Sequence, residues 1–218
     1  MGWKGNDMEL EDIGGKIRAS LDAKNKAREI ALPKARQVIR SCSVAIRAVH
    51  REKYEEATKH LDEAKAHLVE AQNVLKDYPQ IYFAGFLQDA EKEYSEGRTT
   101  FALVTGAPLP EPDELGIGYP PYLSGLGEAM GELRRHILDI IRRGKLTEGE
   151  RFLTIMDDVY YFLISFDYPD ALTPGLRRIT DLARSVMEKT RGDLTTAMRQ
   201  HDLRNAMDRL EGKLSASR

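Results

Sequence analysis

Apolar residues recur every three to four positions along almost the whole chain, and this period limits the possible folds more than any other feature. In the segment 34–50, for example, Val38, Cys42 and Val49 share helical spacing while basic residues occupy the other faces. No stretch of useful length alternates with the period of two that is typical of β-strands. The sequence therefore predicts an all-α protein, an up-and-down bundle of about seven helices.

Prolines, glycines and capping residues predict where these helices begin and end. Pro33 fits the first turn of one helix, Thr147 and Glu150 have the spacing of a capping box, and Asp193 is placed to cap a last helix. Pro79 stops one helix and Gly144 closes another. The expected helices span 34–50, 55–78, Gln80–Val104, 122–144, 147–168, 173–192 and 193–214.

The chain has 218 residues, enough to bury a core as one domain, and we expect residues 1–218 to form one. The Pro/Gly-rich stretch at about 105–121 cannot be a regular helix, and its apolar residues predict an ordered loop. The two ends, about 1–10 and 214–218, are expected to fray.

Composition excludes several classes of function. The formal charge of −2 does not steer the protein toward nucleic acid, so binding to a polyanion requires a local basic patch. The single cysteine, Cys42, excludes an internal disulfide and a CxxC zinc site, and its neighbours predict a small core or interface residue. With no apolar run long enough to cross a bilayer and no signal peptide, the protein is expected to be cytoplasmic, without a membrane partner.

Two pairs of glutamates carry the main chemical signal. Glu93 and Glu96 are three residues apart and lie beside the apolar stripe of their helix, while Glu128 and Glu132 are four apart on another helix. A carboxylate beside a core must be paired, protonated or bound to a metal, because unpaired burial is costly. If the two helices meet, the carboxylates could form an all-oxygen site for Mg²⁺ or Mn²⁺ that activates water in phosphodiester cleavage.

Glycines and arginines near these glutamates leave two interpretations open. Gly125, Gly127 and Gly131 weaken the helix that carries the second pair, which indicates a close approach of a backbone or a ligand. Paired glutamates on helices are, however, often solvent-exposed and neutralised by arginines, here Arg98, Arg134 and Arg135.

Other motifs are absent or less specific. The sequence has no P-loop, no GxGxxG and no Glu-x-x-His pair of the ferritin type, and the histidines, among them His50, are predicted to lie at the surface or an interface. One helix and its end carry a run of basic residues that forms either a solvated face or a contact with phosphates. These residues are Lys34, Arg36, Arg40, Arg47 and Arg51.

Four segments together resemble the translin/TRAX family, and more closely its TRAX (translin-associated factor X) branch. The segments are "LPKARQVIRSCSVAIRAVHR", "KEYSEG", "YLSGLGEAMGELRRHILDIIRRGKL" and "FLTIMDDVYYFLISF", and the resemblance extends from about residue 30 to residue 210. It implies a translin-like all-α subunit that assembles into a closed, usually octameric shell, and for TRAX a Mg²⁺-dependent endoribonuclease. Glu93 and Glu96 match the two signature glutamates of TRAX, and Glu128 and Glu132 match its later acidic pair, with glutamate at position 128 where TRAX usually has aspartate.

These observations lead to one main hypothesis and two alternatives. The main hypothesis is a homo-oligomeric, Mg²⁺- or Mn²⁺-dependent endoribonuclease that cleaves single-stranded RNA at the four glutamates. The basic helix would bind nucleic acid together with Arg98 and Arg135. The alternatives are a non-catalytic, translin-like scaffold that binds RNA or DNA and an all-α NTP pyrophosphatase.

Overall fold

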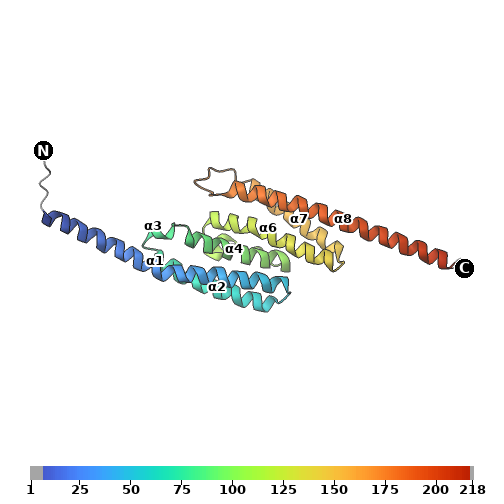
Figure 1. Ribbon diagram of the computed structural model, residues 1–218, viewed down its shortest axis with the longest axis horizontal. Helices are drawn as coiled ribbons and strands as arrows, with labels where there is room; N and C mark the ends of the chain where they lie inside the picture. Colours follow the sequence, from blue (N-terminus) through green and yellow to red (C-terminus); the bar gives the residue numbers. More distant parts are fainter. Residues whose placement is uncertain (1–6, 217–218) are drawn as a thin grey trace.

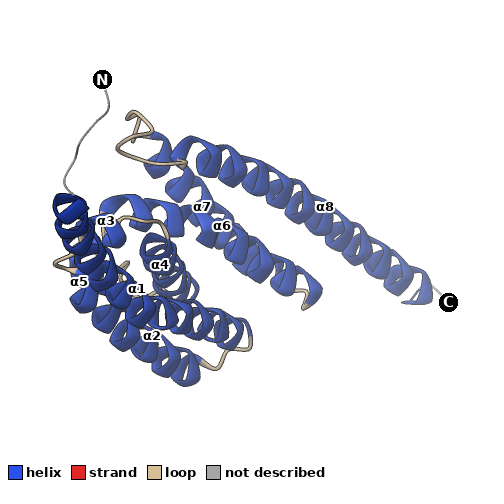
Figure 2. Ribbon diagram, turned by 60° about the vertical axis from the view of Figure 1, so that its left-hand side comes forward, coloured by secondary structure: helices blue, strands red, loops and turns tan. Residues whose placement is uncertain are grey.

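The computed structural model describes residues 7–216, and within this range every regular element is a helix (Figures 1 and 2). The prediction of an all-α bundle is therefore confirmed. Residues 7–216 contain eight helices where about seven were predicted for the chain, and two of the eight have only four residues. In chain order they are α1 (Asp7–His50), α2 (Tyr54–Leu75), α3 (Pro79–Tyr82), α4 (Phe86–Thr105), α5 (Pro112–Leu115), α6 (Tyr119–Arg142), α7 (Leu146–Ile164) and α8 (Leu176–Ala216).

The central pair of helices is α4 and α6. Helix α1 packs against α2 and α4, and helix α6 packs against α7 and α8, so that α4 and α6 are covered on both sides (Figure 1). The core between them consists of fully buried residues such as Tyr94, Leu126 and Leu133. Cys42 is also fully buried, as predicted, and packs near Gly97.

Helix α1 begins much earlier than predicted. It starts at Asp7 and contains Pro33 in its interior, where the sequence placed Pro33 in the first turn. Proline removes only its own N–H from the helix, which leaves the carbonyl of Glu29 without its usual partner. The buried Ala27, Ala31 and Ala35 sit on both sides of the proline and keep the helix packed against the core.

Three other predicted boundaries are also wrong. The helix predicted for 80–104 is interrupted before α4, because the chain turns at Gly85, where φ is +101°. Lys145 occupies the N-cap of α7 without any side-chain capping bond, so Thr147 and Glu150 form no capping box. Asp193 caps no helix, because α8 runs through it without a break and its carboxylate pairs with Arg134 at 2.8 Å.

The loop and the two ends also differ in detail from the expectation. The segment 105–121 contains α5, and its Leu115 and Ile117 are buried while Leu109 and Tyr119 are exposed. Residues 7–10 and 214–216 are helical and not frayed, and the remainder of both ends lies outside the described residues. No helix within 7–216 is long and apolar enough to cross a membrane.

The first part of α1 and the last part of α8 project from the bundle toward opposite ends (Figure 1). Both projecting segments expose large apolar side chains at helical spacing, with exposed fractions of 48–57% on α1 and 55–62% on α8. They are Leu10, Ile13, Ile17 and Leu21 on α1, and Leu203, Met207, Leu210 and Leu214 on α8.

Candidate metal centre

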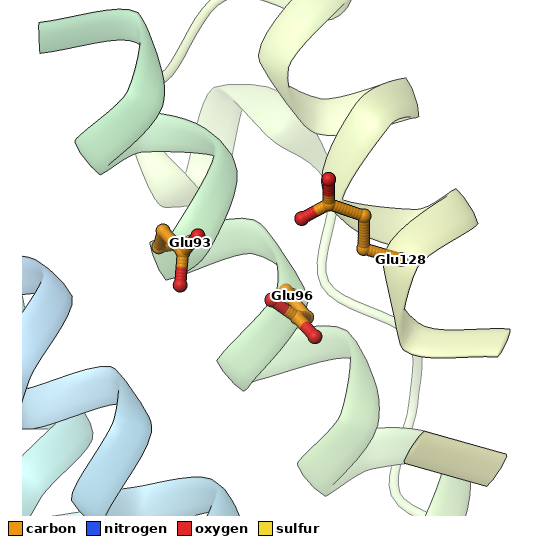
Figure 3. A group of neighbouring side chains, drawn as sticks. All are labelled: Glu93, Glu96 and Glu128. Atoms are coloured by element: carbon orange, nitrogen blue, oxygen red, sulfur yellow. The ribbon is translucent and has the colours of Figure 1, made fainter. Parts of the chain in front are cut away.

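Three of the four predicted glutamates meet between the two central helices. Glu93 and Glu96 extend from α4, and Glu128 extends toward them from α6 (Figure 3). One carboxylate oxygen from each residue lies within 4.8 Å of the others, and all three side chains are partly buried. The close crossing of α4 and α6 therefore brings two separate acidic motifs into one cluster, which we call the carboxylate centre.

Gly125 allows the two helices to approach this closely. A Cβ atom at position 125 would lie 2.4 Å from the backbone oxygen of Lys92 and 2.6 Å from the Cβ of Ser95. The contact is reinforced by Ser95, whose Oγ donates a hydrogen bond of 3.1 Å to the backbone oxygen of Tyr122. The neighbouring Gly127 has a different role, because its Cβ would meet Ile179 of α8 at 2.2 Å.

Alanine at position 125 should destabilise the protein, whereas alanine at position 131 should stabilise it. The Gly125→Ala methyl group collides with the backbone of α4, which does not yield as a side chain does, so we expect a loss of about 3 kcal/mol. Apart from the adjacent residues and backbone of its own helix, no described atom lies within 4 Å of a Cβ at position 131. Gly131→Ala should therefore gain about 0.5–1 kcal/mol from its higher helix propensity. Urea unfolding of both variants measures this difference. Equal effects would mean that the close helix crossing does not depend on Gly125.

The carboxylate centre carries more negative charge than its neighbours neutralise. The pKa of Glu96 is raised to about 8. Burial is the largest cause, and the charges of Glu93 and Glu128 act in the same direction. Burial also raises the pKa of Glu93, against the opposing effect of Lys92. Lys92 is the one cation with a described ion pair to the cluster, with its Nζ 3.0 Å from Glu128 and 3.8 Å from Glu93. One lysine thus faces three carboxylates.

Glu132, the fourth predicted glutamate, lies outside the three-carboxylate cluster. Its carboxylate is hydrogen-bonded to Nε2 of His50, and Arg135 lies 4.0 Å away. The hydrogen bond with His50 lowers the pKa of Glu132, which is opposite to the shift at Glu96. The charge of Glu132 still contributes to the raised pKa of Glu96, so the residue adjoins the carboxylate centre without joining it.

His50 is a residue of this region that sequence reasoning misplaced. It was predicted at the surface or an interface, but it is only 8% exposed, and its Nδ1 has no hydrogen-bond partner among the described residues. The pattern along α1 gives no signal for its contact with Glu132, because the two residues are 82 positions apart.

The seven predicted basic residues separate into three groups. Arg47, Arg51 and Arg135 line one groove of about 660 Å³ between the end of α1 and α6, where Arg142 and Arg143 also lie. We call this the basic groove, and His50 forms part of its wall.

The other four basic residues lie elsewhere. Lys34 pairs with Glu70 at 2.5 Å, and Arg98 donates hydrogen bonds to Asp62 at 2.7 Å and to the hydroxyl of Tyr94 at 2.9 Å. The two that remain, Arg36 and Arg40, are exposed on α1.

The carboxylate centre is a cluster of three acidic residues that could hold a metal ion. Mg²⁺ prefers oxygen ligands at 2.0–2.1 Å, so two ligands on opposite sides of the ion lie about 4.2 Å apart. Neighbouring oxygens around such an ion lie about 3 Å apart. The three carboxylate oxygens, now within 4.8 Å of one another, would therefore have to move closer to bind one ion together. A divalent cation would also supply the positive charge that Lys92 alone does not.

Comparisons with known proteins agree with this description. No family model matches the chain. The uncharacterized protein MJ0175 of Methanocaldococcus jannaschii is 31% identical over 193 residues, which cover 88% of this chain and 86% of the relative.

Solved structures provide the name of the class. C3PO of Archaeoglobus has been solved alone and in a complex with duplex RNA, and it is 31% identical to this chain with a TM-score of 0.78. The match covers 84% of this chain and 95% of the chain in the RNA complex. Apo-C3PO of Nematostella has a TM-score of 0.73 over 90% of this chain and 100% of that one, but its identity of 19% shows the fold alone. The fold and the relatives thus define the class as the helical subunits from which C3PO complexes are built. The chain belongs to the translin/TRAX family.

Proposed function

We propose that this protein is a TRAX-like, Mg²⁺- or Mn²⁺-dependent endoribonuclease that cleaves single-stranded RNA. The observation that carries this proposal is the carboxylate centre, where Glu93, Glu96 and Glu128 converge with one lysine between them. The solved complex of the Archaeoglobus relative with duplex RNA supports RNA as the class of substrate. A bound divalent ion would supply an activated water and offset the charge that develops on the phosphodiester.

The residues of this chain would divide the work of binding between two places. Glu93, Glu96 and Glu128 would hold the ion. Because the pKa of Glu96 is about 8, this residue keeps its proton near neutral pH, and binding of the ion would displace that proton. Glu132 adjoins the centre, and its hydrogen bond with His50 fixes the direction of its carboxylate. In the basic groove, Arg51 and Arg135 would bind RNA phosphates and align the strand with the centre.

The active form would be a homo-oligomer, a closed shell of eight subunits, each a single domain of residues 1–218. The apolar side chains exposed on the projecting parts of α1 and α8 support this assembly, because such surfaces usually pack against another subunit. The structural relatives are C3PO complexes. We propose a cytoplasmic location for it.

Cleavage of a labelled single-stranded RNA with and without metal tests the proposal. We expect cleavage with Mg²⁺, none with EDTA, and a decrease of roughly 100-fold or more in the Glu128→Gln variant, because it removes a charged ligand. The control variant Glu150→Gln, exposed on α7, should cleave as the parent does.

The other outcomes point to the other two functions. Salt-sensitive RNA or DNA binding without cleavage and without a metal requirement would indicate a translin-like scaffold. Hydrolysis of free nucleotides but not of RNA would indicate an NTP pyrophosphatase. Equal cleavage by Glu128→Gln and Glu150→Gln would remove the carboxylate centre from the mechanism.

A further inference from the structure

A pocket of about 820 Å³ lies directly beside the carboxylate centre. Its walls come from the start of α4, one face of α6, the start of α8 and the connection between α3 and α4. Glu128 belongs both to this wall and to the carboxylate centre, and its ion-pair partner Lys92 also lines the wall. A molecule in the pocket would therefore reach the centre directly. Pockets of about 300–1,000 Å³ are typical of small-molecule sites.

An exposed aromatic ring lies in the wall of this pocket. Phe83 is 73% exposed, which is unusual for a phenylalanine, and its ring centroid lies 5.0 Å from that of Tyr82. The backbone beneath it is held firmly, because Gln88 donates to the carbonyl of Tyr82 at 3.0 Å and accepts from the N–H of Gly85 at 3.0 Å. The hydroxyl of Tyr82 donates to the buried Glu91 at 3.0 Å. The backbone that carries the Phe83 ring is therefore rigid, which reduces the entropy cost of stacking a ligand on the ring.

Charged groups of both signs surround the ring. Lys92 from α4 and Arg178 from α8 both line the pocket, and the guanidinium of Arg178 makes no hydrogen bond or ion pair with any residue in 7–216. Asp89 also lines the pocket, and its carboxylate makes no hydrogen bond with the residues in 7–216. An aromatic face with nearby cations for a phosphate and a carboxylate for N–H groups is the set of contacts that a nucleotide requires.

We propose that this pocket binds one nucleotide of the RNA, next to the phosphodiester that is cleaved, with its base stacked on Phe83. Lys92, on the side of the carboxylate centre, contacts the phosphate, and Asp89 accepts a hydrogen bond from the base. The inference rests on the proposed function for the position of the cut but not for the binding of the base. A base that stacks on Phe83 fixes the register of the strand. The pocket would thus determine which phosphodiester lies at the carboxylate centre.

Fluorescence of 2-aminopurine tests the pocket without relying on cleavage. A set of RNA oligonucleotides, each with one 2-aminopurine at a different position, is titrated with protein in Mg²⁺ in the non-cleaving Glu96→Gln background. We expect one position to show a strong change in fluorescence, and Phe83→Ala to abolish it. Since a base stacked on an aromatic ring contributes about 1–3 kcal/mol, Phe83→Ala should weaken binding roughly 5- to 150-fold.

Two further variants separate stacking from a structural effect. Phe83→Trp should preserve the fluorescence change because it retains an aromatic face. Tyr161→Ala, at an aromatic residue that is 64% exposed on α7 and outside the pocket, should bind as the parent does. The proposal is overturned if Phe83→Ala binds as tightly as Tyr161→Ala, or if its loss of binding accompanies a change in oligomer mass, which would identify Phe83 as a subunit contact. Failure of the parent to cleave RNA would leave the fluorescence result intact and would contradict only the proposed function.

Discussion

The Glu96→Gln variant will lose Mg²⁺-dependent RNA cleavage and will nevertheless be more stable than the parent when no metal is bound. Glu96 contributes a carboxylate to a cluster in which one lysine faces three acids. The amide is a poor ligand for a hard cation, so cleavage should fall by roughly 100-fold or more. Without metal, the same change removes a partly buried group that must either bind a proton or carry a charge next to Glu93 and Glu128. The free energy of unfolding should therefore rise.

The pH dependence of stability identifies Glu96 as the source of this effect. Its pKa is about 8 in the folded protein and close to 4.5 in the unfolded chain, so between these values the folded state binds more protons. Stability of the metal-free parent should therefore fall as the pH rises from about 5 to 8, by an amount on the order of a few kcal/mol, and then level off. Glu96→Gln should remove most of this slope.

Urea unfolding in EDTA at a series of pH values measures the free energy of unfolding of the parent and of Glu96→Gln. Glu150→Gln is the control for loss of one exposed carboxylate. Addition of Mg²⁺ should stabilise the parent most near pH 8, because the ion no longer competes with a proton there. If Glu96→Gln retains the slope of the parent, the acidic groups of the centre do not share a buried environment and the cation site is wrong.

The helical fold could be predicted because its signal is local. A period of three to four residues is present in each segment separately, and it requires no knowledge of the partner helix. The boundaries failed where tertiary packing overrides the local signal. Pro33 is kept inside α1 by buried alanines on both sides, and Asp193 lies within α8 because Arg134 of another helix neutralises it.

The acidic motifs could be predicted for the same reason, but their meeting could not. Spacing alone places Glu93 and Glu96 on one face, while the crossing that adds Glu128 depends on contacts of Gly125 with the backbone of α4. The partner of Glu132 was not predictable, because His50 lies on another helix and is 82 positions away in the sequence. A conspicuous cluster of glycines within seven residues was the one local sign that two backbones approach.

The basic groove was also not predictable as a unit, because its arginines come from the end of α1 and from α6. From the sequence, basic residues could be grouped only by the helix that carries them, so Lys34 and Arg51 were assigned to the same basic face. The structure pairs Lys34 with Glu70 on the neighbouring helix and brings Arg51 to Arg135 instead. An arginine without a strong partner can neutralise a phosphate, whereas a paired lysine must first lose its partner.

The double variant Arg51→Gln/Arg135→Gln should therefore bind single-stranded RNA more weakly and with a shallower dependence on salt. Each phosphate contact to a single strand contributes about 0.7 to the slope of log K against log salt, so the loss of two contacts should lower the slope by about 1.4. The affinity should fall on the order of 10-fold near 0.15 M salt and approach that of the parent toward 1 M.

A control of equal charge decides whether the position or only the charge matters. The variant Lys34→Gln/Arg177→Gln also removes two positive charges, but neither residue lines the groove. Lys34 pairs with Glu70 at 2.5 Å, and Arg177 pairs with Asp167 at 3.1 Å. Fluorescence anisotropy of a labelled RNA, measured in Mg²⁺ with the Glu96→Gln background to prevent cleavage, should give a nearly unchanged slope for this control. Equal slopes for both double variants would mean that RNA responds to the net charge of the subunit, and the basic groove would then have no specific part in guiding the strand to the carboxylate centre.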